Sequence, residues 1–402
     1  MVSDAGRLEP PLGRLGFVAA GKGLEEVVAA QTAISDIDGK LGKLWYAGYS
    51  IDDLARNSTF EEVTFLLHHG RLPNRDELDE LTEQMVNDRQ AAAFLSHIMP
   101  TLAEQTSPMS MLRTSVSAAS AYDPDGWDQG PEANYRKALR LIALMPTLIA
   151  SYDRHRKGQA IVEPNPTLPH AANFLYMLTG EEPSQEFADA FDTMFILYAD
   201  HTMNASTFTA RVVASTLADM HSAVTAALAA LKGPLHGGAN ELAMRMLEDI
   251  GEVGRARQYV QDLFARKEKI MGFGHRVYRH VDDPRTTILR PVSQALGGSV
   301  GEPQWYEIAR EVEAVAFEER GLRPNVDFYA GSVLHYLGLP EDLFTPMFAS
   351  SRSAGWTAHI REQYADNRII RPESEYIGPR DQVWAPIENR GPVDRESEEA
   401  AL

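Results

Sequence analysis

Three short stretches of the chain each place one ionisable side chain among glycine, aromatic and polar residues. They are Gly233–Asn240 around His236, Gly272–Tyr278 around His275, and Asn325–Tyr329 around Asp327. Small residues let backbone and ligand approach closely, while histidine and aspartate can move protons near neutral pH. Two histidines and an aspartate in such settings predict a proton-transfer site.

His236 is expected just ahead of a helix. Gly233-Pro234 ends the alanine-rich segment before it, and Asn240 can cap the helix that follows. The positive end of that helix disfavours an imidazolium ion, so a neutral imidazole could donate its N–H to an oxygen that acquires negative charge. A histidine here could instead bond only to loop carbonyls, and the residues alone leave both interpretations open.

Asp327 lies between Asn325 and two aromatic residues, at the start of an apolar helix rich in small residues. Partial desolvation raises the proton affinity of a carboxylate, which suits a general base. Alternatively, Asn325 or Asp327 caps that helix.

The order, spacing and neighbours of the three side chains resemble citrate synthase and its near relatives, from about Ile34 to Gly378. In that family they form the catalytic triad that joins an acyl-CoA to a 2-oxo acid. The resemblance implies that Asp327 removes a methyl proton from acetyl-CoA while His236 bonds the thioester oxygen. It also implies that His275 polarises the ketone of oxaloacetate, and that water then hydrolyses citryl-CoA.

The same resemblance implies further substrate contacts, and arginine suits them because its guanidinium group gives two parallel bonds to a carboxylate. The implied oxaloacetate ligands are His201, Arg285, Arg352 and, from across a homodimer interface, Arg371. The implied CoA contacts are Gly272, Gly274 and Arg279. No metal or cofactor is implied, because acetyl-CoA is a substrate.

The chain departs from the family's pattern at four places near these residues, one of which is Ala330, where a serine is common. The spacing from His275 to Arg285 is one residue longer than usual. Ala47 stands where arginine is common, and Thr202-Met203 replaces a pair that usually contains glutamate. None of these changes touches a catalytic position.

Helix signals dominate the elements that must position the site. Ser50-x-x-Asp53 and Ser58-x-x-Glu61 are typical of capping boxes, and a hairpin is expected within Ile34–Tyr49, broken at Asp38-Gly39. Further helices are expected at about 74–89, 130–155, 185–198, 207–231, 240–250, 255–269, 284–296, 303–319, 326–337 and 342–363. The expected fold class is all-α, a mainly helical two-domain citrate-synthase-like fold with a small N-terminal β-hairpin.

The resemblance implies a discontinuous, dimer-forming large domain of residues 1–236 and 339–402. The small domain, 237–338, would form the CoA side of the cleft. Gly237, Gly238 and Gly338 flank it and are hinge candidates, since closing before chemistry would protect the thioester from water.

Composition limits the classes of function. The chain has 402 residues, 44% hydrophobic content, no cysteine, and 38 basic against 57 acidic residues, a net charge of -19. This acidity argues against binding to nucleic acid or anionic membrane, and with no apolar leader or long apolar run we expect a soluble cytoplasmic protein. The segment Arg266–Arg290 is an exception, with seven basic and three acidic residues, and predicts either an anion-attracting site or a solvated helix face.

The expected function is that of a Si-type citrate synthase, an acyltransferase that makes citrate and CoA from acetyl-CoA, oxaloacetate and water. The alternative is a 2-methylcitrate synthase that uses propionyl-CoA, since one methylene changes binding by only ~1–3 kcal/mol. Two remote alternatives are a catalytically silent paralogue and a serine hydrolase. The last would use Ser299 in Gly297-Gly-Ser-Val-Gly301, although the preceding segment is helix-like and lacks the strand that a nucleophile elbow needs.

Overall fold

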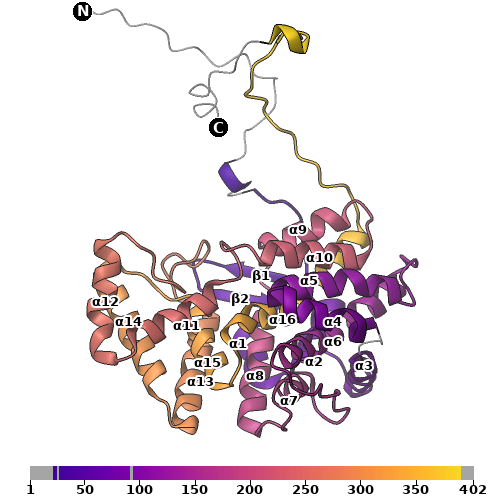
Figure 1. Ribbon diagram of the computed structural model, residues 1–402. Helices are drawn as coiled ribbons and strands as arrows, with labels where there is room; N and C mark the ends of the chain where they lie inside the picture. The colour runs from indigo at the N-terminus through magenta and orange to yellow at the C-terminus, as the bar shows by residue number, and fades with distance from the viewer. Residues whose placement is uncertain (1–20, 25–26, 91–93, 391–402) are drawn as a thin grey trace, which may run out of the picture. The chain divides into compact units, whose positions relative to one another are not determined.

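The structure, a computed structural model, describes residues 21–24, 27–90 and 94–390 (Figure 1). The chain forms two compact units, Met1–Ile369 and Ile370–Leu402. Among the described residues, the first unit contains sixteen α-helices and one small sheet, and the second contains the short 3-10 helix Ile387–Asn389. The all-α prediction is therefore confirmed.

The predicted hairpin is present and gains a third short strand. Strands β1 (Ser35–Asp38), β2 (Lys43–Tyr46) and β3 (Tyr49–Ser50) pair antiparallel in the order β1-β2-β3. The turn after β1 packs directly on the segment that follows His275, because a Cβ atom on Gly39 would lie 2.6 Å from the carbonyl oxygen of Val277. Glycine is thus needed for this close approach, which places the sheet beside the candidate site.

The first eight helices are α1 (Ile51–Asn57), α2 (Phe60–His69), α3 (Arg75–Asp88), α4 (Phe94–Gln105), α5 (Pro108–Ala119), α6 (Pro131–Arg156), α7 (His170–Thr179) and α8 (Gln185–Tyr198). Most of them lie toward the right of Figure 1, while α1 and α8 lie near the middle and contact α13 (Pro284–Val300). Ser50 and Asn74 cap α1 and α3 as predicted. The capping box of α2 lies one residue later than predicted, with Thr59 and Glu62 in place of Ser58 and Glu61.

The remaining helices follow the predicted segments with one correction. They are α9 (Ala205–Ala214), α10 (Met220–Leu231), α11 (Ala239–Ile250), α12 (Val253–Ala265), α13 (Pro284–Val300), α14 (Gln304–Arg320), α15 (Val326–Tyr336) and α16 (Phe344–Ala365). The single helix predicted over 207–231 is wrong, because the chain turns between α9 and α10. Leu217 adopts a left-handed φ of 62°, and the Asp219 side chain caps α10 by accepting the Ser222 N–H at 3.0 Å.

Helix α16 is buried along most of its length and packs on α6, α9 and α10. At Gly355 its backbone meets the turn that follows α8, where the Gly355 N–H donates to the Ala199 carbonyl at 3.0 Å. A Cβ atom on Gly355 would lie 2.4 Å from that carbonyl oxygen, so only glycine permits the contact. The contact brings His201, two residues later, beside α16.

Helices α11 to α15 pack mainly on one another, with α13 and α11 against α15 and α12 against α14. They occupy the left of Figure 1 and coincide with the segment predicted as the small domain. The division into 237–338 and the rest stays a prediction.

Candidate active site

A short antiparallel pairing joins the loop before His275 to the loop before Asp327. The Gly274 N–H donates to the Arg323 carbonyl at 3.0 Å, and the Asn325 side-chain amide donates to the Gly274 carbonyl at 3.0 Å. Two of the three predicted catalytic segments are therefore held together by a backbone bond and a side-chain bond.

Asp327 lies in the first turn of α15, and the hydrogen bonds there show which residue caps that helix. Asn325 is the N-cap, because its side-chain oxygen accepts the Asp327 N–H at 3.0 Å. The Asp327 carboxylate instead accepts a hydrogen bond at Oδ1 from the Tyr198 hydroxyl, at 2.8 Å. Burial raises the pKa of Asp327, although the Tyr198 bond and Arg285 oppose the rise.

His275 has one ring nitrogen committed as an acceptor. Its Nδ1 accepts the backbone N–H groups of Val277 at 3.0 Å and Tyr278 at 3.2 Å. Burial, with the nearby charge of Arg285, lowers the pKa of His275 to about 4. At neutral pH the ring is therefore a neutral imidazole that carries its proton on Nε2.

In His236 the accepting ring nitrogen is Nε2, whereas in His275 it is Nδ1. His236 precedes α11, as predicted, and its Nε2 accepts the backbone N–H of Ser206 at 3.2 Å, with the Ser206 hydroxyl 2.9 Å away. Trp356 donates to that hydroxyl at 3.1 Å and fixes its position. Burial, with the charge of Arg352, lowers the pKa of His236 to about 4, so the ring is neutral with its proton on Nδ1.

His201 lies beside His275, with ring centroids 5.3 Å apart in an edge-to-face arrangement. Burial, followed by the charge of Arg285, holds the pKa of His201 well below its usual range. Within the described part of the chain, its Nε2 and the Tyr278 hydroxyl are buried without hydrogen-bond partners. Buried polar atoms of this kind usually have partners, so they suit a polar ligand.

Arg285 and Arg352 are both buried, each with one edge fixed by the protein. Arg285 forms a bidentate pair with Asp283, with N–O distances of 3.0 and 2.7 Å. The Arg352 Nε donates at 2.6 Å to the Tyr198 carbonyl, at the C-terminal end of α8, where a cation is favoured. The structure therefore brings both predicted carboxylate-binding arginines to the surroundings of His201 and Asp327.

Asp200, which precedes His201, is a site residue that the sequence did not single out. Its Oδ2 accepts the Thr202 N–H at 3.0 Å and the Ser35 hydroxyl, and its Oδ1 lies 3.3 Å from Nε2 of His359. Thr202 is held at a left-handed φ of 50°. Asp200 thus fixes the backbone on both sides of His201; the only signal in the sequence was its place beside that histidine.

The predicted CoA contacts differ in their surroundings. Gly272 is packed, because a Cβ atom there would lie 2.8 Å from that of Phe328, whereas a Cβ on Gly274 would meet nothing within 4 Å. Arg279 lines a cavity of about 700 Å³, together with Lys40 and His280. Gly274 and Arg279 are therefore accessible to a ligand.

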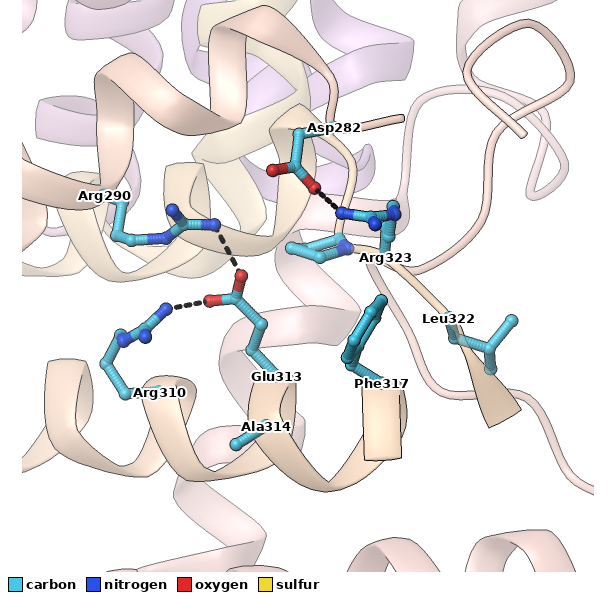
Figure 2. Close-up of a pocket in the computed structure, with 9 residues that line it drawn as sticks. Asp282, Arg290, Arg310, Glu313, Ala314, Phe317, Leu322 and Arg323 are labelled. Atoms are coloured by element: carbon cyan, nitrogen blue, oxygen red, sulfur yellow. Dashed lines mark hydrogen bonds and ion pairs between the residues drawn. The ribbon is translucent and has the colours of Figure 1, made fainter. Parts of the chain in front are cut away.

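A second cavity, of about 260 Å³, lies between α13, α14 and the loop before α15 (Figure 2). The Glu313 carboxylate forms ion pairs with Arg290 and Arg310, each at 2.5 Å. Arg323 forms an ion pair with Asp282 at 2.6 Å. These ion pairs place each of the three guanidinium groups against a carboxylate, although among the described residues Nε of Arg290 is buried without a hydrogen-bond partner. The positive charge predicted for Arg266–Arg290 is partly neutralised here.

Two further residues singled out from the sequence, Arg371 and Ser299, lie elsewhere in the chain. Arg371 belongs to the second unit, so its role stays a prediction. Ser299 lies in the last turn of α13 and donates to Glu186 at 2.7 Å, so the strand-to-helix elbow of a serine hydrolase is absent there.

The described residues hold neither a cluster suited to a metal ion nor a helix that could cross a membrane. No grouping of three or more histidine, aspartate or glutamate side chains suited to a metal ion occurs in 21–24, 27–90 and 94–390. Over the same ranges, no helix has the length and apolar character that crossing a membrane requires.

Comparisons with known proteins show the family of the chain. The family model "Citrate synthase, C-terminal domain" matches residues 23–373. Citrate synthase 2 of Bacillus subtilis is 50% identical over 374 residues, covering 93% of this chain and 100% of that protein. The 2-methylcitrate synthase of Mycobacterium tuberculosis is 43% identical over 363 residues, covering 90% of this chain and 91% of that protein.

A solved structure gives the same result. The citrate synthase of Thermoplasma acidophilum, solved as a ternary complex with carboxymethyl coenzyme A and oxaloacetate, has a TM-score of 0.86 and 34% identity, covering 92% of this chain and 99% of that one. The chain belongs to the citrate synthase family.

We predict that His236 and His275 are neutral opposite tautomers. In ¹⁵N NMR spectra, assigned with His236→Asn and His275→Asn variants, His236 should be protonated at Nδ1 and His275 at Nε2, and both should titrate near pH 4. Because the unfolded chain binds these protons below about pH 6.5, the free energy of unfolding should fall as the pH drops from 6.5 toward 4. Titration of either ring near pH 6.5 would contradict the prediction.

Proposed function

We propose that this protein is a Si-type citrate synthase that condenses acetyl-CoA with oxaloacetate and water to give citrate and CoA. The observation that carries the proposal is the pair of neutral imidazoles with opposite tautomers, His275 and His236, together with a desolvated carboxylate at Asp327. Two N–H donors and one base are what enolisation and carbonyl attack require.

In the first step, Asp327 takes a proton from the acetyl methyl group. The electron pair of that C–H bond moves toward the thioester oxygen, where the Nδ1–H of His236 stabilises the developing charge. A neutral donor suits this step, because an imidazolium would give its proton away and leave no fixed dipole.

In the second step, the enolate carbon attacks the ketone of oxaloacetate. The ketone π electrons pass to its oxygen, where a hydrogen bond from Nε2–H of His275 stabilises the alkoxide. This oxygen then takes up one proton to become the hydroxyl of citryl-CoA, which balances the proton removed by Asp327. Arg285, Arg352 and His201 would hold the two carboxylates during this step. Water then cleaves the citryl-CoA thioester and releases citrate and CoA.

The proposal includes an arrangement in domains and subunits. Residues 237–338 would close on the remainder around Gly237, Gly238 and Gly338, and Arg279 would contact a CoA phosphate in the cavity that it lines. The working form would be a cytoplasmic homodimer in which Arg371 of one subunit reaches the site of the other. The family resemblance supports these features.

We predict that acetyl-CoA is the preferred acyl donor. Side-by-side steady-state kinetics with oxaloacetate should give a higher kcat/KM for acetyl-CoA than for propionyl-CoA, by about 10-fold or more, which is the range that one methylene allows. The reverse order would identify a 2-methylcitrate synthase, and activity with neither donor would support a silent paralogue.

The assignment of the base predicts the behaviour of Asp327→Asn. The amide cannot accept a proton, so exchange of the acetyl-CoA methyl protons with D₂O and citrate formation should both fall by about 10³-fold or more, while oxaloacetate affinity remains. NMR measures the exchange, and calorimetry measures the binding. Near-normal turnover of the variant would contradict the assignment.

The proposed shared site predicts complementation between two inactive variants. His275→Ala loses carbonyl polarisation and Arg371→Ala loses a carboxylate contact, so each homodimer should be nearly inactive. In a mixed dimer, one site carries both changes while the other is intact. Activity should therefore reappear in proportion to the fraction of mixed dimers.

The control for this experiment is Asp327→Asn mixed with His275→Ala. Both residues belong to one subunit's half of the proposed site, so this mixture would restore one intact site only if they came from different subunits. Native mass spectrometry counts the mixed dimers. If they form with Arg371→Ala and activity stays at the parental level, Arg371 does not act across the interface.

A further inference from the structure

The Tyr198 hydroxyl contacts the proposed base directly, although no step above uses it. Its oxygen lies 2.8 Å from Oδ1 of Asp327, and the ring is fully buried. The ring packs against Phe348 with centroids 4.4 Å apart, so the hydroxyl is held in place. A buried tyrosine hydroxyl beside a carboxylate donates its hydrogen, because an ionised carboxylate only accepts.

We propose that Tyr198 is a positioning residue that holds Oδ1 of Asp327, so that Oδ2 is the oxygen that takes the substrate's proton. This inference rests on the proposed role of Asp327 as the base. A carboxylate rotates about one bond, and the Tyr198 hydrogen bond together with the start of α15 leaves one oxygen committed to the protein.

The same residue also holds a substrate-binding arginine. The Tyr198 backbone carbonyl accepts Nε of Arg352 at 2.6 Å. One residue therefore contacts the base through its side chain and the proposed oxaloacetate ligand through its backbone. This arrangement fixes the acetyl-CoA end of the reaction relative to the oxaloacetate end, and reaction rates depend steeply on that distance.

Tyr198 also joins two parts of the fold. It ends α8, whereas Asp327 starts α15 within the proposed small domain. The other end of α8 contacts the same segment, where Glu186 accepts the Ser299 hydroxyl at 2.7 Å. If the domains separate, the bond to Asp327 breaks, so the base would be oriented only when they are together.

The Tyr198 hydrogen bond and several charged groups each affect the pKa of Asp327. A donor to the ionised form lowers the pKa of Asp327, against the effect of burial. The other charges that act on this carboxylate are Arg285 of α13, Asp283 at the N-cap of α13 and Arg352 of α16. On the other elements packed against α15, Glu313 of α14 faces Tyr329 and Glu248 of α11 faces His335.

The test is Tyr198→Phe, which removes one oxygen atom and keeps the ring. The Asp327 pKa, measured by ¹³C NMR of the carboxyl carbon and assigned with Asp327→Asn, should rise by about one unit or more, since a bond to a charged group is worth that much. The acid limb of kcat/KM should move to higher pH by a similar amount. Above that limb, methyl-proton exchange should fall about 10- to 100-fold, because the base is no longer oriented.

Tyr329→Phe is the matched control. Tyr329 is a buried tyrosine on the same helix as Asp327, and it donates to another carboxylate, that of Glu313. Its loss should lower thermal stability about as much as Tyr198→Phe, but leave the Asp327 pKa and the acid limb unchanged. Equal shifts in both variants would show a merely structural effect and overturn the inference.

A second variant keeps the Tyr198 hydroxyl and changes only its strength as a hydrogen-bond donor. 3-Fluorotyrosine at position 198 is a stronger donor, so the Asp327 pKa should fall. If neither substitution moves that pKa while Asp327→Asn abolishes exchange, the Tyr198 inference is wrong and the proposed base stands. If Asp327→Asn retains exchange, the proposed base itself is wrong.

Discussion

Burial sets the charge state of the histidines around the candidate site, and two buried guanidinium groups, Arg285 and Arg352, reinforce it. Burial lowers the pKa of each nearby histidine, and one or both arginines lower it further, so His201, His236 and His275 are neutral. The arginines themselves cannot lose their protons at any relevant pH. Neutral hydrogen-bond donors follow from this arrangement, and acid catalysis by imidazolium does not.

The backbone then decides which nitrogen of each ring donates. Main-chain N–H groups point at Nδ1 of His275 and at Nε2 of His236, and a main-chain donor cannot change its role as a hydroxyl can. The two rings therefore have opposite tautomers and present different edges to a ligand. Loop geometry near these residues is consequently as important for the proposed chemistry as the side chains are.

The sequence predicts some residues of the candidate site but not the others. His236, His275 and Asp327 stood out because glycine and aromatic residues surround them, and Asn325 was separable from Asp327 as a helix cap only once the side-chain bonds were known. Tyr198 looks like an ordinary apolar helix residue in the sequence. Its role depends on a contact 129 residues away, which no local pattern encodes. The break between α9 and α10 was missed because no glycine or proline marks it.

The contacts of α16 explain why so many site residues come from one short segment. Four residues on two turns of α16 each bond to a different residue between α8 and the start of α9. Arg352 contacts Tyr198, Gly355 contacts Ala199, Trp356 contacts Ser206 and His359 contacts Asp200. A helix turns about 100° per residue, so a shift of one position would break all four contacts together. The registration of α16 therefore positions the proposed base, the His236 ring and the arginine proposed to bind a carboxylate at once, and the close approach at Gly355 fixes that registration.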